Sequence, residues 1–358
     1  MPKLDAYFRA MQQQGASDLH LVAGNLPAMR IHGELRKLKA EALTDEGLRE
    51  LLRELAAPDG WARFEETGDL DFAYELGGVG RFRANYFVQK FGAAAVFRLI
   101  PSKILTCEEL GLPDAVKKFA FLRKGLVLVT GPTGSGKSTT LAAIIDEANR
   151  SRRDNIITIE DPIEFVHEGK GCLVSHREVG AHTRSFAAAL RAALREDPDL
   201  ILVGELRDKE TVALAVEAAA TGHLVFGTLH TQNAPKTVDR VVEVFTADEQ
   251  PQIRATLADS LKGVVAQNLL RKADGSGRVA ALEVMVVTPA VSNLIREAKT
   301  YQIPSAIQTG KKHGMQSLDG AIQDLLDRKV VDAKEAYEKA AEKERFAKYL
   351  PDAPELTP

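Results

Sequence analysis

Gly131-Pro132-Thr133-Gly134-Ser135-Gly136-Lys137-Ser138 is the stretch that decides the fold, because it fits the pattern G-x-x-x-x-G-K-[ST]. The six residues before it, 125–130 (GLVLVT), form a short apolar run rich in valine, which predicts a buried parallel strand. The residues after it, 139–148 (TTLAAIIDEA), predict a helix. A strand, a glycine-rich loop and a helix in this order form a phosphate-binding loop, or P-loop. The alternative is a glycine turn that matches the pattern by chance.

The chemistry of a P-loop depends on these residue types. Glycines let backbone N–H groups approach phosphate oxygens, and the N-terminus of the following helix adds partial positive charge. Lys137 is predicted to reach the β- and γ-phosphates of a nucleotide, and Ser138 to hold Mg²⁺ through its hydroxyl. The residues predicted to bind the nucleotide are Gly131, Pro132, Thr133, Gly134, Ser135, Gly136, Lys137, Ser138 and Thr139.

Length and composition limit the class of protein. The 358 residues suffice for two domains, and 45% hydrophobic with 27% charged residues is ordinary for a soluble globular protein. A net charge of −3 gives no support to a strongly basic nucleic-acid-binding protein. The two cysteines, Cys107 and Cys172, lie far apart and argue against a disulfide framework or a zinc site. The N-terminus has no apolar signal core and no apolar run reaches the ~18 residues of a spanning helix, so we expect a cytoplasmic protein.

The chain divides into two regions of different pattern. Residues 1–100 predict a small α+β domain, residues 101–112 a linker, and residues 113–358 a second domain. The elements predicted in the first domain are strands at 18–22 and 29–31, a helix at 45–55, and an antiparallel meander of strands at 69–76, 81–88 and 93–100.

The second domain alternates short apolar runs with helical segments, which is typical of a βαβ core. Its predicted strands are 125–130, 156–159, 200–203 and 224–229, and its predicted helices are 139–149, 184–196 and 211–220. Beyond residue 245 the chain is predicted to be mostly helical. Its last helix, over 332–349, begins with a capping box formed by Asp332 and Glu335.

Two acidic segments follow predicted strands and therefore belong at the edge of the sheet where ligands bind. Glu205 comes directly after the apolar run 200–203, which is the Walker B pattern, and is predicted to hold a magnesium-bound water or to polarise the attacking water. Glu160 and Glu164 follow the strand 156–159 and are both candidates for the general base. The alternatives are a solvated acid for Glu205 and a capping role for Glu160 or Glu164.

Charge on the γ-phosphate must also be neutralised. His230 ends the strand 224–229 and is predicted to hydrogen-bond the γ-phosphate, although a lone histidine is more often structural. Arg184, Arg191 and Arg195 share one face of the predicted helix 184–196. Arg81 and Arg83 share one face of an N-terminal strand. Any of these arginines could act as a finger on the γ-phosphate, or be a solvated surface residue.

These motifs together carry a family resemblance. The P-loop, the acidic box IEDPIEF (159–165), GELRD (204–208) and GHLVFGTLHT (222–231) stand in the order and spacing of secretion and type IV pilus motor ATPases. The resemblance extends from about residue 16 to residue 319. Within this superfamily the chain most resembles the retraction ATPases of twitching motility, through NLIRE (293–297) and IPSAIQTG (303–310).

The resemblance implies an α/β fold, in which a small PAS-like α+β domain precedes a RecA-like P-loop ATPase core with a helical C-terminus. It also implies a hexameric Mg-ATP-hydrolysing motor that retracts type IV pili, peripheral at the inner membrane through a platform protein and without direct nucleic-acid contact. ATP would bind between the two domains. The arginines that match the family are Arg81 and Arg83 on the N-terminal strand, and Arg195 and Arg207 in the core.

Some residues depart from the family pattern, and three competing functions stay open. Leu206 stands where the family usually has methionine, a volume-conserving change, and Ser292 stands where the retraction motif usually has arginine. A pilus-assembly or type II secretion motor is the nearest competing function, but relatives of that kind typically have a longer N-terminus and often a four-cysteine zinc module. A P-loop also suits a non-hydrolysing nucleotide-binding regulator or a nucleic-acid translocase. An acidic pI and the lack of an aromatic–basic groove argue against the translocase.

Overall fold

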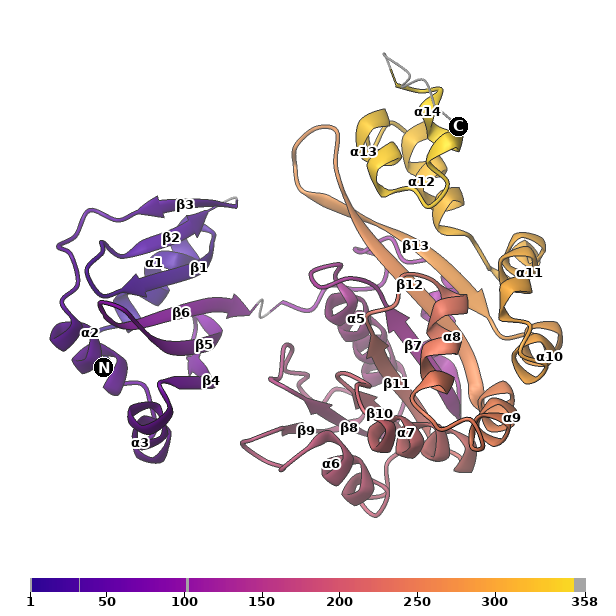
Figure 1. Ribbon diagram of the computed structural model, residues 1–358, viewed down its shortest axis with the longest axis horizontal. Coiled ribbons are helices and arrows are strands. Elements are labelled where there is room, and N and C mark those ends of the chain that lie inside the picture. The colour runs from indigo at the N-terminus through magenta and orange to yellow at the C-terminus, as the bar shows by residue number, and fades with distance from the viewer. Residues whose placement is uncertain (1, 32, 101–102, 351–358) are drawn as a thin grey trace. The chain divides into compact units, whose positions relative to one another are not determined.

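The computed structural model describes residues 2–31, 33–100 and 103–350, and it contains two sheets, each in its own compact unit (Figure 1). The first unit comprises Met1–Lys103 and Pro162–Val166, and the second comprises Ile104–Asp161 and His167–Pro358. Part of the predicted linker, residues 101–102, lies outside the described residues. The described residues contain no helix that is both long enough and apolar enough to cross a membrane.

The first unit is an antiparallel sheet with helices packed against it. Its strands are β1 (Ala16–Val22), β2 (Ala28–Ile31), β3 (Glu34–Lys37), β4 (Asp69–Leu76), β5 (Gly80–Gln89) and β6 (Gly92–Ile100), in the order β3-β2-β1-β6-β5-β4. Its helices are α1 (Asp5–Gln14), α2 (Asp45–Arg53) and α3 (Pro58–Thr67). Phe8 of α1 stacks on Phe82 of β5, with ring centroids 4.2 Å apart. The predicted meander is confirmed as β4-β5-β6, whereas α1, α3 and β3 were not predicted from the sequence.

The second unit is built on a seven-stranded sheet in the order β13-β12-β7-β11-β10-β8-β9. The strands are β7 (Gly125–Thr130), β8 (Asn155–Glu160), β9 (Leu173–Glu178), β10 (Leu200–Val203), β11 (Leu224–Leu229), β12 (Leu261–Arg271) and β13 (Arg278–Val286). Neighbouring strands are parallel throughout, except that β13 is antiparallel to β12. All six residues of β7 are buried, as the apolar run before the P-loop predicted.

Helices cover both faces of this sheet. They are α4 (Asp114–Lys118), α5 (Lys137–Ser151), α6 (Phe186–Ala193), α7 (Lys209–Thr221), α8 (Ala234–Glu243), α9 (Gln250–Ser260), α10 (Pro289–Arg296), α11 (Ile303–Thr309), α12 (Leu318–Asp327), α13 (Ala333–Lys339) and α14 (Lys343–Ala347). Alternate residues of β7 belong to different apolar clusters: Leu126 and Leu128 pack with α6 to α9, and Val127 and Val129 pack with α4 and α5. The predicted βαβ core is therefore confirmed.

The part beyond residue 245, predicted to be mostly helical, contains the helices α9 to α14, but residues 261–286 form the long hairpin β12–β13, which adds two strands beside β7. One prediction about the C-terminal end is wrong. The single helix expected over 332–349 is two short helices, α13 and α14. Asp332 does cap α13, since its Oδ1 accepts a hydrogen bond from the Glu335 N–H at 2.7 Å. The Glu335 carboxylate instead accepts from the Arg271 N–H of β12, so only half of the capping box forms.

Candidate nucleotide-binding site

The P-loop has a backbone that only glycine adopts readily. Gly131, Gly134 and Gly136 have φ angles of 143°, 78° and 87°, all in the region that a Cβ atom disfavours. Helix α5 begins at Lys137, directly after these turns. The first N–H groups of a helix have no partner within the helix and attract anions. The loop and the helix N-terminus are thus shaped to bind phosphate.

Lys137 is almost fully buried at the base of this loop. Its Nζ donates to the carbonyl oxygens of Gly131 at 2.9 Å and Pro132 at 3.1 Å. Nearby, the hydroxyl of Ser135 is buried and has no hydrogen-bond partner among the described residues. A buried hydroxyl is normally paired, so an oxygen-rich ligand at this position would satisfy it. The donors of the loop therefore fit a nucleotide phosphate.

Gln267, which lies on β12 against the P-loop, was not predicted from the sequence. Its Nε2 donates to the Ser135 carbonyl oxygen at 2.6 Å, and its Oε1 accepts from the Thr140 hydroxyl at 2.7 Å. Gln267 is separated by 132 residues from Ser135 and by 127 from Thr140. No local pattern links such distant positions. The one available signal was the valine-rich run before Gln267, which favours a strand over a helix.

Glu205 and His230 lie together at the carboxyl ends of β10 and β11. Glu205 Oε1 is 3.0 Å from His230 Nε2, and Glu205 Oε2 is 2.6 Å from Arg207. Because β7, β10 and β11 run parallel, the P-loop leaves the sheet at this same edge. Glu205 thus contacts both His230 and Arg207, two residues that the sequence placed in the same site.

The environment of Glu205 keeps its carboxylate charged. Partial burial by itself would raise the pKa of Glu205, but the Arg207 guanidinium and His230 beside it outweigh this effect, so its pKa lies below the ordinary value. The same ion pair raises the pKa of Arg207. An ionised carboxylate can orient water or a hydrated cation at neutral pH.

The acidic box is divided between the two units. Glu160 is buried at the end of β8, and its Cα would lie 3.3 Å from a Cβ built on Gly204, the residue before Glu205. Glu160 is therefore beside the backbone of Gly204. Glu164 is exposed and lies in Pro162–Val166, which belongs to the first unit. Of the two candidate bases, only Glu160 is placed at the strand ends of the second unit.

The arginine predictions need one correction. Helix α6 begins after Ser185, whose hydroxyl caps it by accepting from the Ala188 N–H, and it ends at Ala193. Arg184 and Arg195 thus lie outside the helix, and of the three proposed arginines only Arg191 is on it. Arg191 is paired with Glu210 of α7, and Arg195 is exposed. Arg81 and Arg83 lie in β5 of the first unit on either side of buried Phe82, so they share a face as expected.

A Mg²⁺ ion at this site would need ligands from a bound nucleotide. Among the described residues no group of three or more His, Cys, Asp or Glu side chains is arranged to hold a metal. Mg²⁺ commonly completes its shell with water and substrate phosphates and needs only one or two protein ligands. The Ser138 hydroxyl at the start of α5 and the charged Glu205 carboxylate match that requirement.

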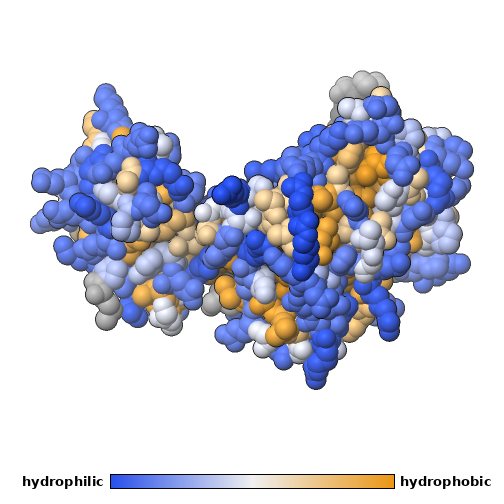
Figure 2. Space-filling model, turned by 90° about the horizontal axis from the view of Figure 1, so that it is seen from below, coloured by the Kyte–Doolittle hydropathy of each residue, from blue (hydrophilic) through white to orange (hydrophobic). Residues whose placement is uncertain are grey.

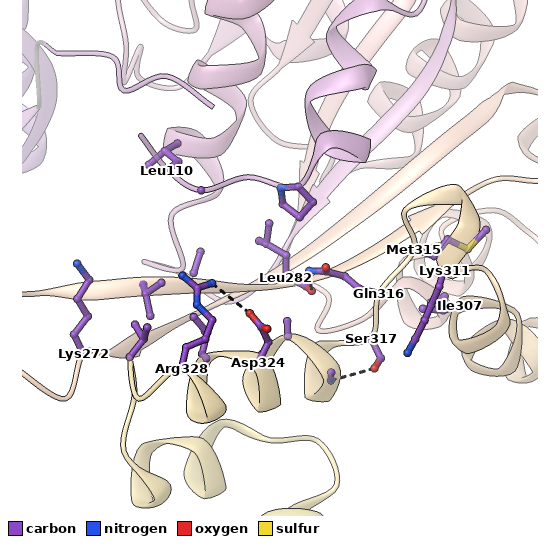
Figure 3. Close-up of a pocket in the computed structure, with 18 of the residues that line it drawn as sticks. Leu110, Lys272, Leu282, Ile307, Lys311, Met315, Gln316, Ser317, Asp324 and Arg328 are labelled. Carbon is purple, nitrogen blue, oxygen red and sulfur yellow. Dashed lines mark hydrogen bonds and ion pairs between the residues drawn. The ribbon is translucent and has the colours of Figure 1, made fainter. Parts of the chain in front are cut away.

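A separate cavity of about 1110 Å³ lies elsewhere in the second unit (Figure 3). Its walls come from β13, α11, α12, α14 and the turn around Leu110, and Asp324 pairs with Arg328 inside it. No residue of the P-loop, the acidic box, GELRD or GHLVFGTLHT lines this cavity. The size of a cavity is therefore no guide to the nucleotide site here, which is better located by its donors and charges.

His167, next to the acidic box, gives the fold a predicted sensitivity to acid. The backbone N–H of buried His167 donates to His176 Nε2 at 3.0 Å, and His176 Nδ1 is 2.8 Å from the Thr158 hydroxyl. Burial, helped by nearby His176 and Lys170 and opposed by Asp146, lowers the pKa of His167 to about 4. The unfolded chain then binds more protons than the folded chain between pH ~6.5 and ~4, so stability falls as pH falls through that window.

Between pH 7.5 and 5, the free energy of unfolding of the wild type should fall because of His167. We expect this fall to be about 2 kcal/mol smaller in His167→Phe, which has no group to protonate at this position. Urea unfolding at the two pH values measures this difference. His313→Phe, at an exposed histidine, is the matched control and should keep the wild-type loss. Equal pH dependence in the wild type and His167→Phe would contradict the prediction.

Comparison with known proteins identifies the family. A model described as "Type II/IV secretion system protein" matches residues 2–338. The type IV pilus retraction ATPase PilT of Pseudomonas aeruginosa is 53% identical over 334 residues, which are 93% of this chain and 97% of that protein. A twitching motility protein of Neisseria gonorrhoeae is 49% identical over 321 residues, 90% of this chain and 86% of that protein.

Solved structures agree with the sequence relatives. A crystal structure of the pilus retraction motor PilT with bound ADP has a TM-score of 0.89 and 45% identity, and the match covers 96% of this chain and 98% of that one. The ATPase DotB of Legionella pneumophila has a TM-score of 0.80 and 29% identity, over 94% of this chain and 95% of that one. The predicted fold class and the predicted superfamily are both confirmed. The chain belongs to the type II/IV secretion system protein family.

Proposed function

We propose that this protein is an Mg-ATP-hydrolysing motor that drives the retraction of type IV pili. The observation that carries the proposal is the cluster at one edge of the sheet, where Glu205 pairs with His230 and Arg207 beside a complete P-loop. A protein that only binds nucleotide needs the P-loop but not a charged, oriented carboxylate next to it. The names of the relatives at 53% and 49% identity, a pilus retraction ATPase and a twitching motility protein, support pilus retraction as the task of the motor.

Each residue then has a chemical role. Lys137 and the loop N–H groups bind the phosphates, and Mg²⁺, held by Ser138 and through water by Glu205, would neutralise charge on the transferred phosphoryl group. Glu205 orients the attacking water, with Glu160 or Glu164 as the base that accepts its proton. His230 and the arginines Arg81, Arg83, Arg195 and Arg207 stabilise the charge that develops on the γ-phosphate.

A pair of measurements tests this function. Purified protein with ATP and Mg²⁺ should release phosphate, and removal of Mg²⁺ with a chelator should stop the release. Deletion of the gene in the source organism should leave pili on the cell surface while twitching is lost. Cells that lack surface pili after deletion would instead identify an assembly or secretion motor. A protein that binds ATP without releasing phosphate would identify a regulator.

We further propose that the motor is a homohexamer that docks on an inner-membrane platform protein from the cytoplasm. Apolar areas remain exposed between hydrophilic ones on the surface (Figure 2), and Leu173 and Tyr301 of the second unit are 75% and 72% exposed. Burial of such side chains favours association. Light scattering after gel filtration should give six times the mass of one chain, and a monomer at working concentration with full activity would contradict the ring.

A further inference from the structure

Gln267 connects three parts of the second unit that are far apart in sequence. It lies on β12, one residue beyond Ala266, which pairs with Thr130 at the end of β7. This register places it level with Gly131, the first residue of the P-loop. Its side chain is 4% exposed, and its two hydrogen bonds join the loop at Ser135 to helix α5 at Thr140, which is 2% exposed. One amide thus holds the loop and the helix that follows it.

The glycines of the loop make this contact possible. A Cβ on Gly131 would lie 2.3 Å from the Gln267 carbonyl oxygen, and a Cβ on Gly136 would lie 2.8 Å from Gln267 Nε2. Both distances are far below ordinary contact. A Cβ on Gly134, in contrast, would meet nothing within 4 Å. Gly131 and Gly136 therefore let the loop lie directly on Gln267, while Gly134 faces open space.

The hydrogen bond to Ser135 also sets a direction. The peptide unit between Ser135 and Gly136 is planar, and in the trans form its C=O and N–H point opposite ways. Since the Ser135 carbonyl points to Gln267, the Gly136 N–H points away from β12. An N–H group aimed this way is one of the donors that a P-loop offers to phosphate oxygens.

We propose that Gln267 is a positioning residue that holds the P-loop in its phosphate-binding form by fixing the peptide unit between Ser135 and Gly136. The proposal rests on the proposed function only in taking a nucleotide phosphate as the ligand. Gln267 acts through the loop and touches no reacting atom. Without its amide, the buried Ser135 carbonyl has lost its partner, and the peptide unit turns toward another donor.

Gln267→Met tests this, because methionine has a similar shape but no hydrogen-bonding amide. The full chain should bind ADP and a slowly hydrolysed ATP analogue about tenfold more weakly or worse, since two buried hydrogen bonds are lost. Calorimetric titration measures the dissociation constants. Gln316→Met is the matched control: Gln316 Nε2 also donates to a backbone carbonyl, that of Leu282 at 2.9 Å, but away from the P-loop. Its nucleotide affinity should equal that of the wild type.

A second series covers the case in which Gln267→Met does not fold. Thr140→Val removes only the hydroxyl that Gln267 accepts from, and should weaken nucleotide binding by several-fold, whereas Thr140→Ser restores the hydroxyl and the affinity. Combining Gln267→Met with Thr140→Val should weaken binding by less than the product of the two single effects, because both remove the same contact.

The outcomes separate this proposal from the function itself. A wild type that binds nucleotide tightly, together with a Gln267→Met protein that binds equally tightly and only melts earlier, overturns the positioning role. A Thr140→Val protein with wild-type affinity does the same. A wild type that binds neither nucleotide refutes the proposed function, whatever the variants do.

Discussion

Lys137→Ala should lower the affinity for ATP by about a hundredfold and reduce phosphate release to background. The Lys137 ammonium is held among the loop carbonyls at 2.9 and 3.1 Å, at the point where the phosphates are expected. A charge-assisted hydrogen bond to phosphate contributes about 1.5–3 kcal/mol, and the loss also removes charge stabilisation in the transition state. Affinity is read from calorimetric titration, and turnover from a phosphate-release assay.

Lys334→Ala is the control for this experiment, since Lys334 is exposed on α13 and belongs to no predicted site. It should bind and hydrolyse ATP like the wild type. A thermal melt of the Lys137→Ala protein checks that the fold is intact. If the folded Lys137→Ala protein hydrolysed ATP at the wild-type rate, the P-loop would not be the site of the reaction.

Glu205→Gln should lower kcat by about 10²–10⁴-fold while ATP affinity stays near the wild-type value. Glutamine keeps the shape of the side chain, but its neutral amide cannot polarise the attacking water or bind a hydrated cation as a carboxylate does. The effect on turnover should be the same over the neutral pH range, because the lowered pKa of Glu205 keeps the wild-type carboxylate ionised there. Steady-state kinetics with parallel binding measurements separate kcat from affinity.

The same substitution has a predicted effect on stability. Since the folded pKa of Glu205 is lowered, its ion pairs stabilise the fold above the ordinary pKa and lose this contribution as pH falls through the folded value. Glu205→Gln should therefore unfold less steeply with acid than the wild type. Glu210→Gln is the control, since Glu210 is exposed on α7 and pairs with Arg191 of α6 instead of His230 or Arg207. A Glu205→Gln protein with wild-type kcat would remove Glu205 from the mechanism.

The sequence was sufficient for the parts of the site that are local. β7, the P-loop and α5 form one continuous segment, so spacing and residue type determine them together. Glu205 and His230 follow short apolar strands, and parallel pairing then brings their carboxyl ends to one edge. The rule predicts that the two residues lie near the same pocket, whereas their 3.0 Å side-chain contact is seen only in the structure.

The sequence-based predictions that were wrong or incomplete depended on contacts with distant residues or on the exact ends of helices. The hairpin β12–β13 was assigned to a helical region, because its pattern suits either element until it is known to pair with β7. Gln267 could not be found for the same reason. Helix α6 was predicted to be longer than it is at both ends. Ser185 was not recognised as its N-cap. Asp197, which has a φ of 51° and precedes Pro198, marks a turn soon after the helix ends.

The way Lys137 is held has a consequence for the cycle of a motor. A motor must discard ADP after every stroke, so its phosphate loop spends part of each turnover empty. Here the ammonium has carbonyl partners within the loop itself, at 2.9 and 3.1 Å. When ATP binds, Lys137 exchanges these carbonyl oxygens for phosphate oxygens. When ADP leaves, the carbonyl oxygens bind the ammonium again, so its charge is not left buried without a partner. The P-loop can therefore keep its phosphate-binding conformation between the release of ADP and the binding of the next ATP.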